Sequence, residues 1–127
     1  MSKLFIAFGA FVGFVAVMLG AFGAHGLKGR VAENLVTAFN TGAQYQMYHA
    51  LALLAVGILL RLFPGKRLLK WSGGFFIAGI FLFCGSLYLL TFIRLPWLGP
   101  ITPVGGLSFM VGWLLLAVAM MRKDKNA

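Results

Sequence analysis

The side chains best suited to chemistry are few, and they gather towards one end of the predicted helices. His25 closes the first apolar run of the chain, and a polar stretch from Gln44 to His49 opens the second. Hydroxyl groups near the same end of the third and fourth runs join them. The candidate cluster is therefore His25, Gln44, Tyr45, Gln46, His49, Ser86, Tyr88, Thr102 and Ser108. This distribution predicts one polar cluster in the outer third of a helical bundle.

His49 has the widest chemical range of this set. Tyr45 and His49 are four residues apart and so share one face of a helix. Counted from the start of its apolar run, His49 lies about 6 Å deep, and His25 lies at the matching end of the neighbouring antiparallel helix. Because an unbonded imidazole is costly in hydrocarbon, we expect His49 to face the interior. We expect it to hydrogen-bond to another span through Gln46, Tyr88 or the region around His25.

Four interpretations of the cluster remain open. The favoured one is structural, with side chains that hydrogen-bond between helices. The second is a binding or permeation site for a quinone, a lipid headgroup or a small polar solute, because buried polar residues in membranes are often functional. Haem ligation by His25 and His49 has only the two histidines in its favour. Zinc lacks further ligands at that depth. We therefore expect no bound cofactor or metal.

Catalysis has little support in the sequence. Glu33 and Asp124 are the only carboxylic acids, so there is no pair of acids for general acid–base chemistry. No nucleophile motif and no glycine-rich loop after a strand occurs, so we expect that the protein is not an enzyme. Pumping driven by an ion gradient also lacks its usual carboxylate within a span.

The composition requires a membrane around these residues. Of 127 residues, 61% are hydrophobic and 10% are charged, whereas a soluble domain has roughly a quarter of its residues charged. Four apolar runs are long enough to cross a bilayer, at about 4–24, 45–62, 71–93 and 101–121. The sequence predicts an all-α fold, a four-transmembrane-helix bundle that forms a single integral membrane domain over 1–127.

A second pattern lies in the longest connection, between the first two runs. Val31, Leu35 and Phe39 recur every four residues, and polar side chains occupy the other side. This spacing predicts a short amphipathic helix between spans 1 and 2 that lies in the interface or caps the bundle.

The basic residues predict the orientation. With four spans, one side of the membrane holds eight Lys and Arg residues, namely Lys3, Arg61, Lys66, Arg67, Lys70, Arg122, Lys123 and Lys125. The other side holds three: Lys28, Arg30 and Arg94. Because basic loops stay in the cytoplasm, both termini are predicted to be cytoplasmic, in the plasma (inner) membrane of a bacterium. The cations fall in short clusters between apolar runs, so we expect membrane lipids and no nucleic acid as partners.

Small residues repeat along the first and last spans. Gly9, Gly13, Gly20 and Gly23 follow one helical face, and Gly105 and Gly112 do the same in the fourth span. Such stripes let helix backbones approach closely in lipid. We expect the first helix to be central and packed within the bundle. A homo-oligomer or a larger membrane complex remains the alternative use of the same stripe.

Five short motifs follow one another in order. They are GAFGAH at 20–25, TGxxYQxxHALA at 41–52, GSLY at 85–88, ITPVGG at 101–106 and GW at 112–113. In this the chain resembles the YgdD-like family of small membrane proteins, a domain of unknown function (number 423). The resemblance implies a multi-pass inner-membrane protein and leaves the activity open. We expect an accessory or structural membrane protein that acts through helix packing and lipid contact. The alternative is a binding or permeation site for a small molecule, quinone or lipid at the polar cluster.

Overall fold

The computed structural model describes residues 1–93 and 95–122. Its elements are α1 (Ser2–Ala21), η1 (Phe22–Gly26), α2 (Glu33–Leu62), α3 (Arg67–Gly79), η2 (Ile80–Cys84), α4 (Gly85–Phe92) and α5 (Leu98–Met121). The described chain is helical without strands, which confirms the all-α prediction. Arg94, Lys123 and Lys125, which the charge count includes, lie outside the described residues.

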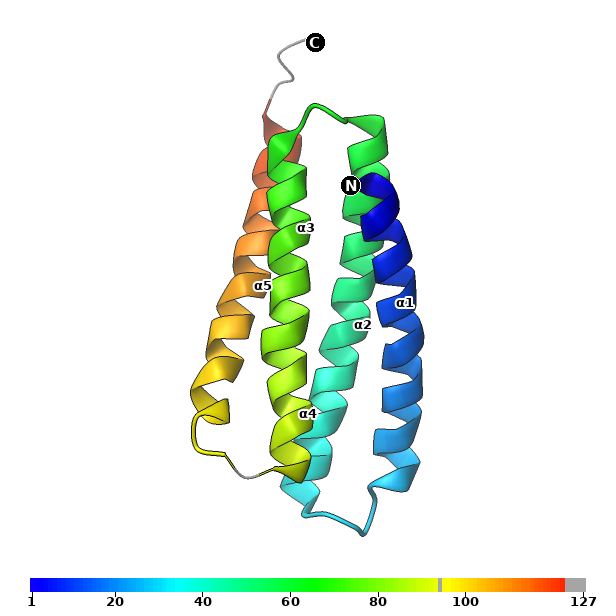
Figure 1. Cartoon of the computed structure of the whole chain (residues 1–127), viewed down its shortest axis with the longest axis vertical. Coiled ribbons are helices and arrows are strands. Elements are labelled where there is room, and N and C mark those ends of the chain that lie inside the picture. The colour runs from blue at the N-terminus through cyan, green and yellow to red at the C-terminus, as the bar shows by residue number, and fades with distance from the viewer. Residues whose placement is uncertain (94, 123–127) are drawn as a thin grey trace.

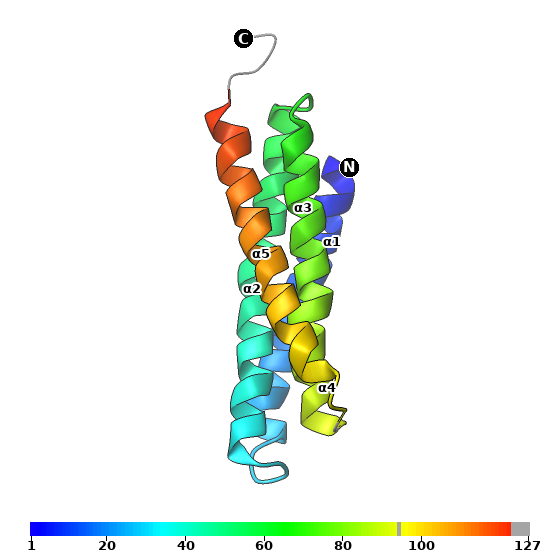
Figure 2. The ribbon, with the colours of Figure 1, turned by 90° about the vertical axis from the view of Figure 1, so that its left-hand side faces the viewer.

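Four helical rods run antiparallel to their neighbours in the chain, because every connection is short (Figure 1). Each rod is long and apolar enough to cross a membrane, and together they cover Ser2–Gly26, Glu33–Leu62, Arg67–Phe92 and Leu98–Met121. Both described ends of the chain lie at the same end of the bundle (Figure 1). Figure 2 shows that α5 crosses the rod formed by α3, η2 and α4 at an angle. The prediction of four spanning helices is therefore confirmed.

The separate amphipathic helix predicted between spans 1 and 2 is wrong, because α2 runs without interruption from Glu33 to Leu62. Thr37 and Thr41 return their hydroxyls to carbonyls one turn earlier and so do not break it. Gly42 does not interrupt the helix either. Its position packs closely against the Tyr88 ring, where a Cβ would lie 2.9 Å from Tyr88 Cε1. At a rise of about 1.5 Å per residue, this helix is ~45 Å long. Its amphipathic first turns thus continue a span and extend beyond a hydrocarbon layer of about 30 Å.

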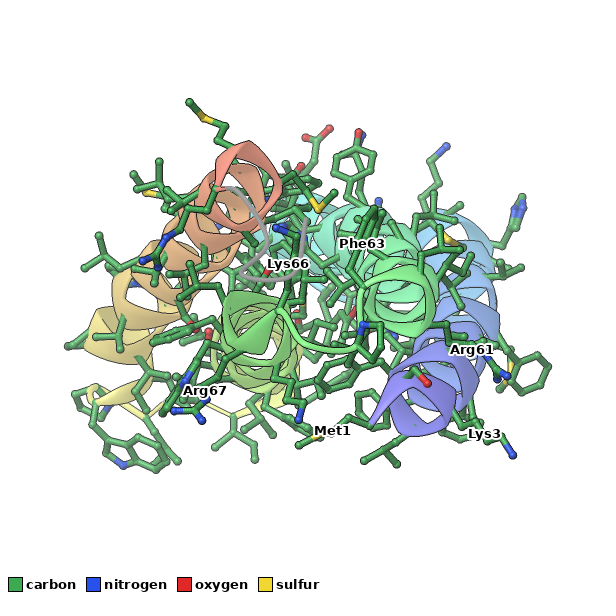
Figure 3. All side chains as sticks on the ribbon, turned by 90° about the horizontal axis from the view of Figure 1, so that it is seen from above. Met1, Lys3, Arg61, Phe63, Lys66 and Arg67 are labelled. Atoms are coloured by element: carbon green, nitrogen blue, oxygen red, sulfur yellow. The ribbon has the colours of Figure 1, made fainter. Side chains whose placement is uncertain are left out.

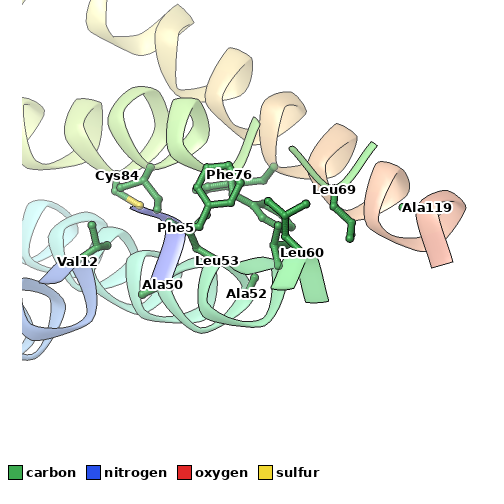
Figure 4. Packing of buried hydrophobic residues seen from close by; sticks show 13 residues of the cluster. Phe5, Val12, Ala50, Ala52, Leu53, Leu60, Leu69, Phe76, Cys84 and Ala119 are labelled. Atoms are coloured by element: carbon green, nitrogen blue, oxygen red, sulfur yellow. The ribbon is translucent and has the colours of Figure 1, made fainter. Parts of the chain in front are cut away.

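The central helix is α2 rather than α1, contrary to expectation. α2 carries eleven buried residues and α1 carries four. Leu53 and Val56 of α2 are fully buried, and they meet Phe5 of α1 and Phe76 of α3 in one apolar core (Figure 4). The reason is geometric: α1 lies at one side of the bundle, so most of its surface faces outward (Figure 1).

The glycines differ in what they contact. A Cβ added at Gly9 would lie 3.0 Å from the Ala50 carbonyl oxygen, and one added at Gly23 would collide with Phe39 and Asn40. Gly13 has ordinary van der Waals spacing. Gly20 has nothing within 4 Å of that position. A continuous contact stripe is therefore wrong at Gly20, because this residue borders a hollow at the surface instead of a neighbouring helix.

The glycines of the fourth span are packed more tightly. A Cβ at Gly105 would lie 2.7 Å from the Cα of Phe83, which belongs to the π-helical turn η2. One at Gly112 would lie 2.7 Å from the Phe76 ring and 3.3 Å from the Ser72 carbonyl oxygen. At these two positions α5 packs directly against the rod formed by α3, η2 and α4.

Candidate functional site

His49 lies at the centre of the bundle in an aromatic surround. Its side chain is 4% exposed, and its ring stacks on Phe109 of α5 with centroids 3.5 Å apart and planes 10° apart. Phe76 of α3 and Trp113 of α5 lie against it at 5.6 and 5.9 Å between centroids. The Tyr45 ring lies 6.2 Å away on the same helix, so the predicted sharing of a face is confirmed.

Both imidazole nitrogens have partners. The Trp113 indole N–H donates to Nε2 of His49 over 3.1 Å, and Nδ1 lies 2.7 Å from the Tyr45 carbonyl oxygen. Since an indole nitrogen only donates and a carbonyl only accepts, the proton of the imidazole is on Nδ1. This arrangement joins α2 to α5 and uses the full hydrogen-bonding capacity of a neutral ring.

The position of His49 differs from the predicted one in depth and in partner. It lies sixteen residues after Glu33, about 24 Å along α2 and close to its midpoint. His49 packs beside Phe76 of α3 and Trp113 of α5, so it lies nearer the end of the bundle that holds both termini than predicted. His49 does face the interior and bond to another helix, but the partner is Trp113 rather than Gln46, Tyr88 or the His25 region.

Gln46 forms the second link of this layer. It is 4% exposed, and its amide nitrogen donates to the Val12 carbonyl of α1 over 2.9 Å. Its amide oxygen accepts from the Tyr88 hydroxyl of α4 over 2.6 Å. One side chain of α2 therefore connects two other helices, and the predicted members Gln46 and Tyr88 do meet.

Serine and threonine hydroxyls link the third rod to α5. Ser108 donates to the Phe75 carbonyl and Ser72 donates to the Gly112 carbonyl, both over 2.7 Å. Nearer the other end of α5, the hydroxyls of Ser86 and Thr102 share a hydrogen bond. Each of these contacts crosses between helices, as in the structural interpretation of the cluster.

The remaining candidates lie apart from this layer. His25 is exposed at the end of η1, and the adjoining Gly23 packs against Asn40, which is about 14 Å of helix away from His49. The two histidines therefore do not form the pair that haem ligation requires. Gln44 is also exposed and donates to the Tyr48 hydroxyl on the outer face of α2. Among the described residues, no three His, Cys, Asp or Glu side chains gather as metal ligands.

His49 borders neither of two hollows that open on the described surface. The first, of about 420 Å³, is bordered by Ala32, Asn34, Leu35, Leu90, Leu95 and Pro96. The second, of about 340 Å³, is bordered by Ala16, Gly20, Ala24, Asn40, Ala43, Gln44 and Met47. In the part of the chain that is described, every buried side-chain nitrogen and oxygen has a hydrogen-bond partner. The polar layer is thus satisfied from within the protein.

Sequence reasoning missed four residues of the layer: Ser72, Phe76, Phe109 and Trp113. Trp113 carried a signal, since it is the one indole that lies well inside an apolar run instead of at a span end. Tryptophan within a span needs a partner for its N–H, and a buried histidine on another helix supplies one. The phenylalanines carried no signal that separates them from the other apolar residues.

Comparison with known proteins agrees with this architecture. The model of the family described as "Protein of unknown function (DUF423)" matches residues 19–106. The chain is 43% identical to the UPF0382 membrane protein YwdK of Bacillus subtilis over 120 residues, which are 94% of this chain and 98% of that one. It is 42% identical to the UPF0382 membrane protein SAB0533 of Staphylococcus aureus over 94% and 97% of the two chains. No solved structure matches it.

The motifs, the four spans and these relatives agree. The chain is a multi-pass membrane protein that belongs to the DUF423 family.

Proposed function

We propose that this protein is an accessory or structural component of the bacterial plasma membrane that acts through helix packing and lipid contact. The observation that carries the proposal is the satisfied interior. Each buried polar side-chain atom of the described residues is bonded within the bundle, so the His49 layer has no donor or acceptor waiting for a ligand. This supports the accessory role over a binding or permeation site at the same residues.

The outer surface supports the same proposal. Large apolar side chains point outward from all four rods, among them Phe11 (62% exposed), Phe81 (64%) and Leu114 (66%). In a membrane this surface contacts lipid tails or other helices. We infer that the protein works by occupying the bilayer next to a neighbour, which is either a second copy or a larger complex.

Photo-crosslinking tests the accessory role. A photoreactive amino acid replaces Phe11 or Leu114, which face outward, and Leu53, which is fully buried, serves as the control. We expect a protein adduct of defined mass from at least one outward position and none from Leu53. An adduct of twice the chain mass identifies a homo-oligomer. Adducts with lipid alone at every outward position would contradict a role through protein contact.

The proposed orientation places the end with both termini in the cytoplasm, because that end carries most of the basic residues. A fluorescent protein that matures only in the cytoplasm, fused after Ala127, should give signal. The same protein fused after Gly29, in the turn between η1 and α2, should give none. The opposite pattern would reverse the proposed orientation.

A further inference from the structure

Five described cations are exposed at the end of the bundle that holds both termini. They are Lys3, Arg61, Arg67, Lys70 and Arg122. Figure 3 shows this end from above, with Lys3 and Arg61 directed outward beside α1 and Arg67 outward beside α3. Glu33 is the single acid among the described residues, and it begins α2 at the opposite end of the bundle. The described part of the protein therefore offers this basic end no carboxylate.

The depth of these cations indicates what they meet. Three of them directly adjoin a residue that faces outward: Leu4 (61% exposed) follows Lys3, Leu62 (67%) follows Arg61, and Trp71 (58%) follows Lys70. Apolar side chains so exposed lie in hydrocarbon, and an exposed tryptophan at a span end lies at the headgroups. The adjoining cations are therefore held at the level of lipid phosphates, with their aliphatic stems along the tails.

Lys66, at the same end, has a different role. It points between the helices (Figure 3) and donates to the carbonyl oxygens of Ala119 and Arg122, each over 2.8 Å. These are among the carbonyls at the end of α5 that lack partners within the helix. Lys66 thus stabilises the fold from within and gives an internal comparison for the outward cations.

We propose that the basic end binds anionic phospholipid headgroups through two pairs of cations, Lys3 with Arg61 beside α1 and Arg67 with Lys70 on α3. The ligand is a lipid phosphate, because Lys3, Arg61 and Lys70 each adjoin an outward-facing apolar residue at the end of a span, and the positive charge of all four cations is opposite to that of an anionic leaflet. The inference rests on membrane insertion alone. It stands whichever way the protein faces and whether or not it assembles with a partner.

Intact-complex mass spectrometry of the purified protein in mild detergent tests this inference. The probes are phosphatidylglycerol and phosphatidylcholine with identical acyl chains, and soluble glycerol 3-phosphate reports binding of a free phosphate. The variants are K3Q/R61Q and R67Q/K70Q, and the matched control K28Q/R30Q removes the same charge from the opposite end. All six side chains are exposed, so the fold is expected to persist and circular dichroism checks it.

Each cation near an anionic surface is worth about fivefold in affinity. We therefore expect the unmodified protein to prefer phosphatidylglycerol. Each basic-end variant should lose at least about tenfold in that binding, while K28Q/R30Q should change it by no more than about twofold. Glycerol 3-phosphate at the same concentration should not bind.

Three results would overturn the proposal. The first is equal binding of phosphatidylglycerol and phosphatidylcholine, which would point to an acidic protein segment as the partner of these cations. The second is a loss of phosphatidylglycerol binding in K28Q/R30Q as large as that in the basic-end variants. The third is binding of glycerol 3-phosphate as strong as that of phosphatidylglycerol.

Discussion

Gly105 is the position where the structure makes its sharpest quantitative prediction. Its helix, α5, approaches the backbone of η2 so closely that an added Cβ would lie 2.7 Å from the Cα of Phe83 and 2.8 Å from the carbonyl carbon of Leu82. The backbone nitrogen of Phe83 is nearer still, and ordinary contact begins at 3.4 Å, so α5 has to move by more than about 0.7 Å in the Gly105→Ala variant. The obstacle is backbone and cannot rotate away. Overpacking of this kind costs about 1–3 kcal/mol.

Gly106, the next residue, is the matched control. A Cβ there would lie 3.8 Å from the Phe83 ring, which is ordinary contact. Alanine is favoured over glycine in a helix by about 1 kcal/mol at both positions, so the difference between the two variants isolates the clash. We expect Gly106→Ala to be neutral or stabilising, and Gly105→Ala to be less stable than it by about 1–3 kcal/mol.

The assay is equilibrium unfolding by a denaturing detergent in mixed micelles, followed by helix content. A Gly105→Ala variant as stable as Gly106→Ala would show that α5 does not pack against η2 as described.

Three further predictions follow from the packing, all read in the same unfolding assay. Gln46→Leu should cost about 1–2 kcal/mol, because it removes the bonds from α2 to two other helices, whereas Gln44→Leu on the exposed face should cost nothing measurable. Lys66→Gln should lower stability by about 1 kcal/mol, because two carbonyls near the end of α5 lose a charged donor; unchanged stability would contradict that cap. Gly20→Leu should be tolerated, because its surroundings are open, while Gly9→Leu meets the backbone of α2 and should destabilise the bundle strongly; equal effects would show that Gly20 is packed.

The spanning helices were predictable because the bilayer imposes them. Runs of about twenty apolar residues without charges have one stable solution in lipid, and the four runs correspond to the four rods. The start of α2 was not predictable in the same way. Apolar content marks where a helix enters hydrocarbon, whereas Glu33–Tyr45 is helical but polar on one side, so hydropathy alone starts the helix too late.

The partners within the polar layer depended on the register of the bundle. Tyr45 and His49 were paired correctly, since four residues in one helix lie on one face. Trp113 and His49 are 64 residues apart, and their contact depends on how far α5 slides along α2. Neither the periodicity of the sequence nor the lengths of the loops determine the position of α5 along α2.

The roles of the glycines show the same limit. Gly9 and Gly20 are alike in spacing, and both belong to the small-residue stripe of the first span. Gly9 lies against the backbone of α2, while Gly20 opens onto a hollow at the surface. Whether a small residue marks a contact or a gap is decided by the crossing of the helices, which spacing along one helix does not specify.

We propose that the His49 layer holds the helices together and is not a ligand site. The most direct test is to purify the unmodified protein and the His49→Gln variant in mild detergent and to identify every co-purified small molecule by mass spectrometry. Glutamine supplies a donor and an acceptor in place of the imidazole, so we expect the variant to fold and to retain the same lipids, with no other molecule at about one per chain in either sample. A quinone, haem or other small molecule bound to the unmodified protein at about one per chain, and absent from a folded His49→Gln variant, would contradict the claim.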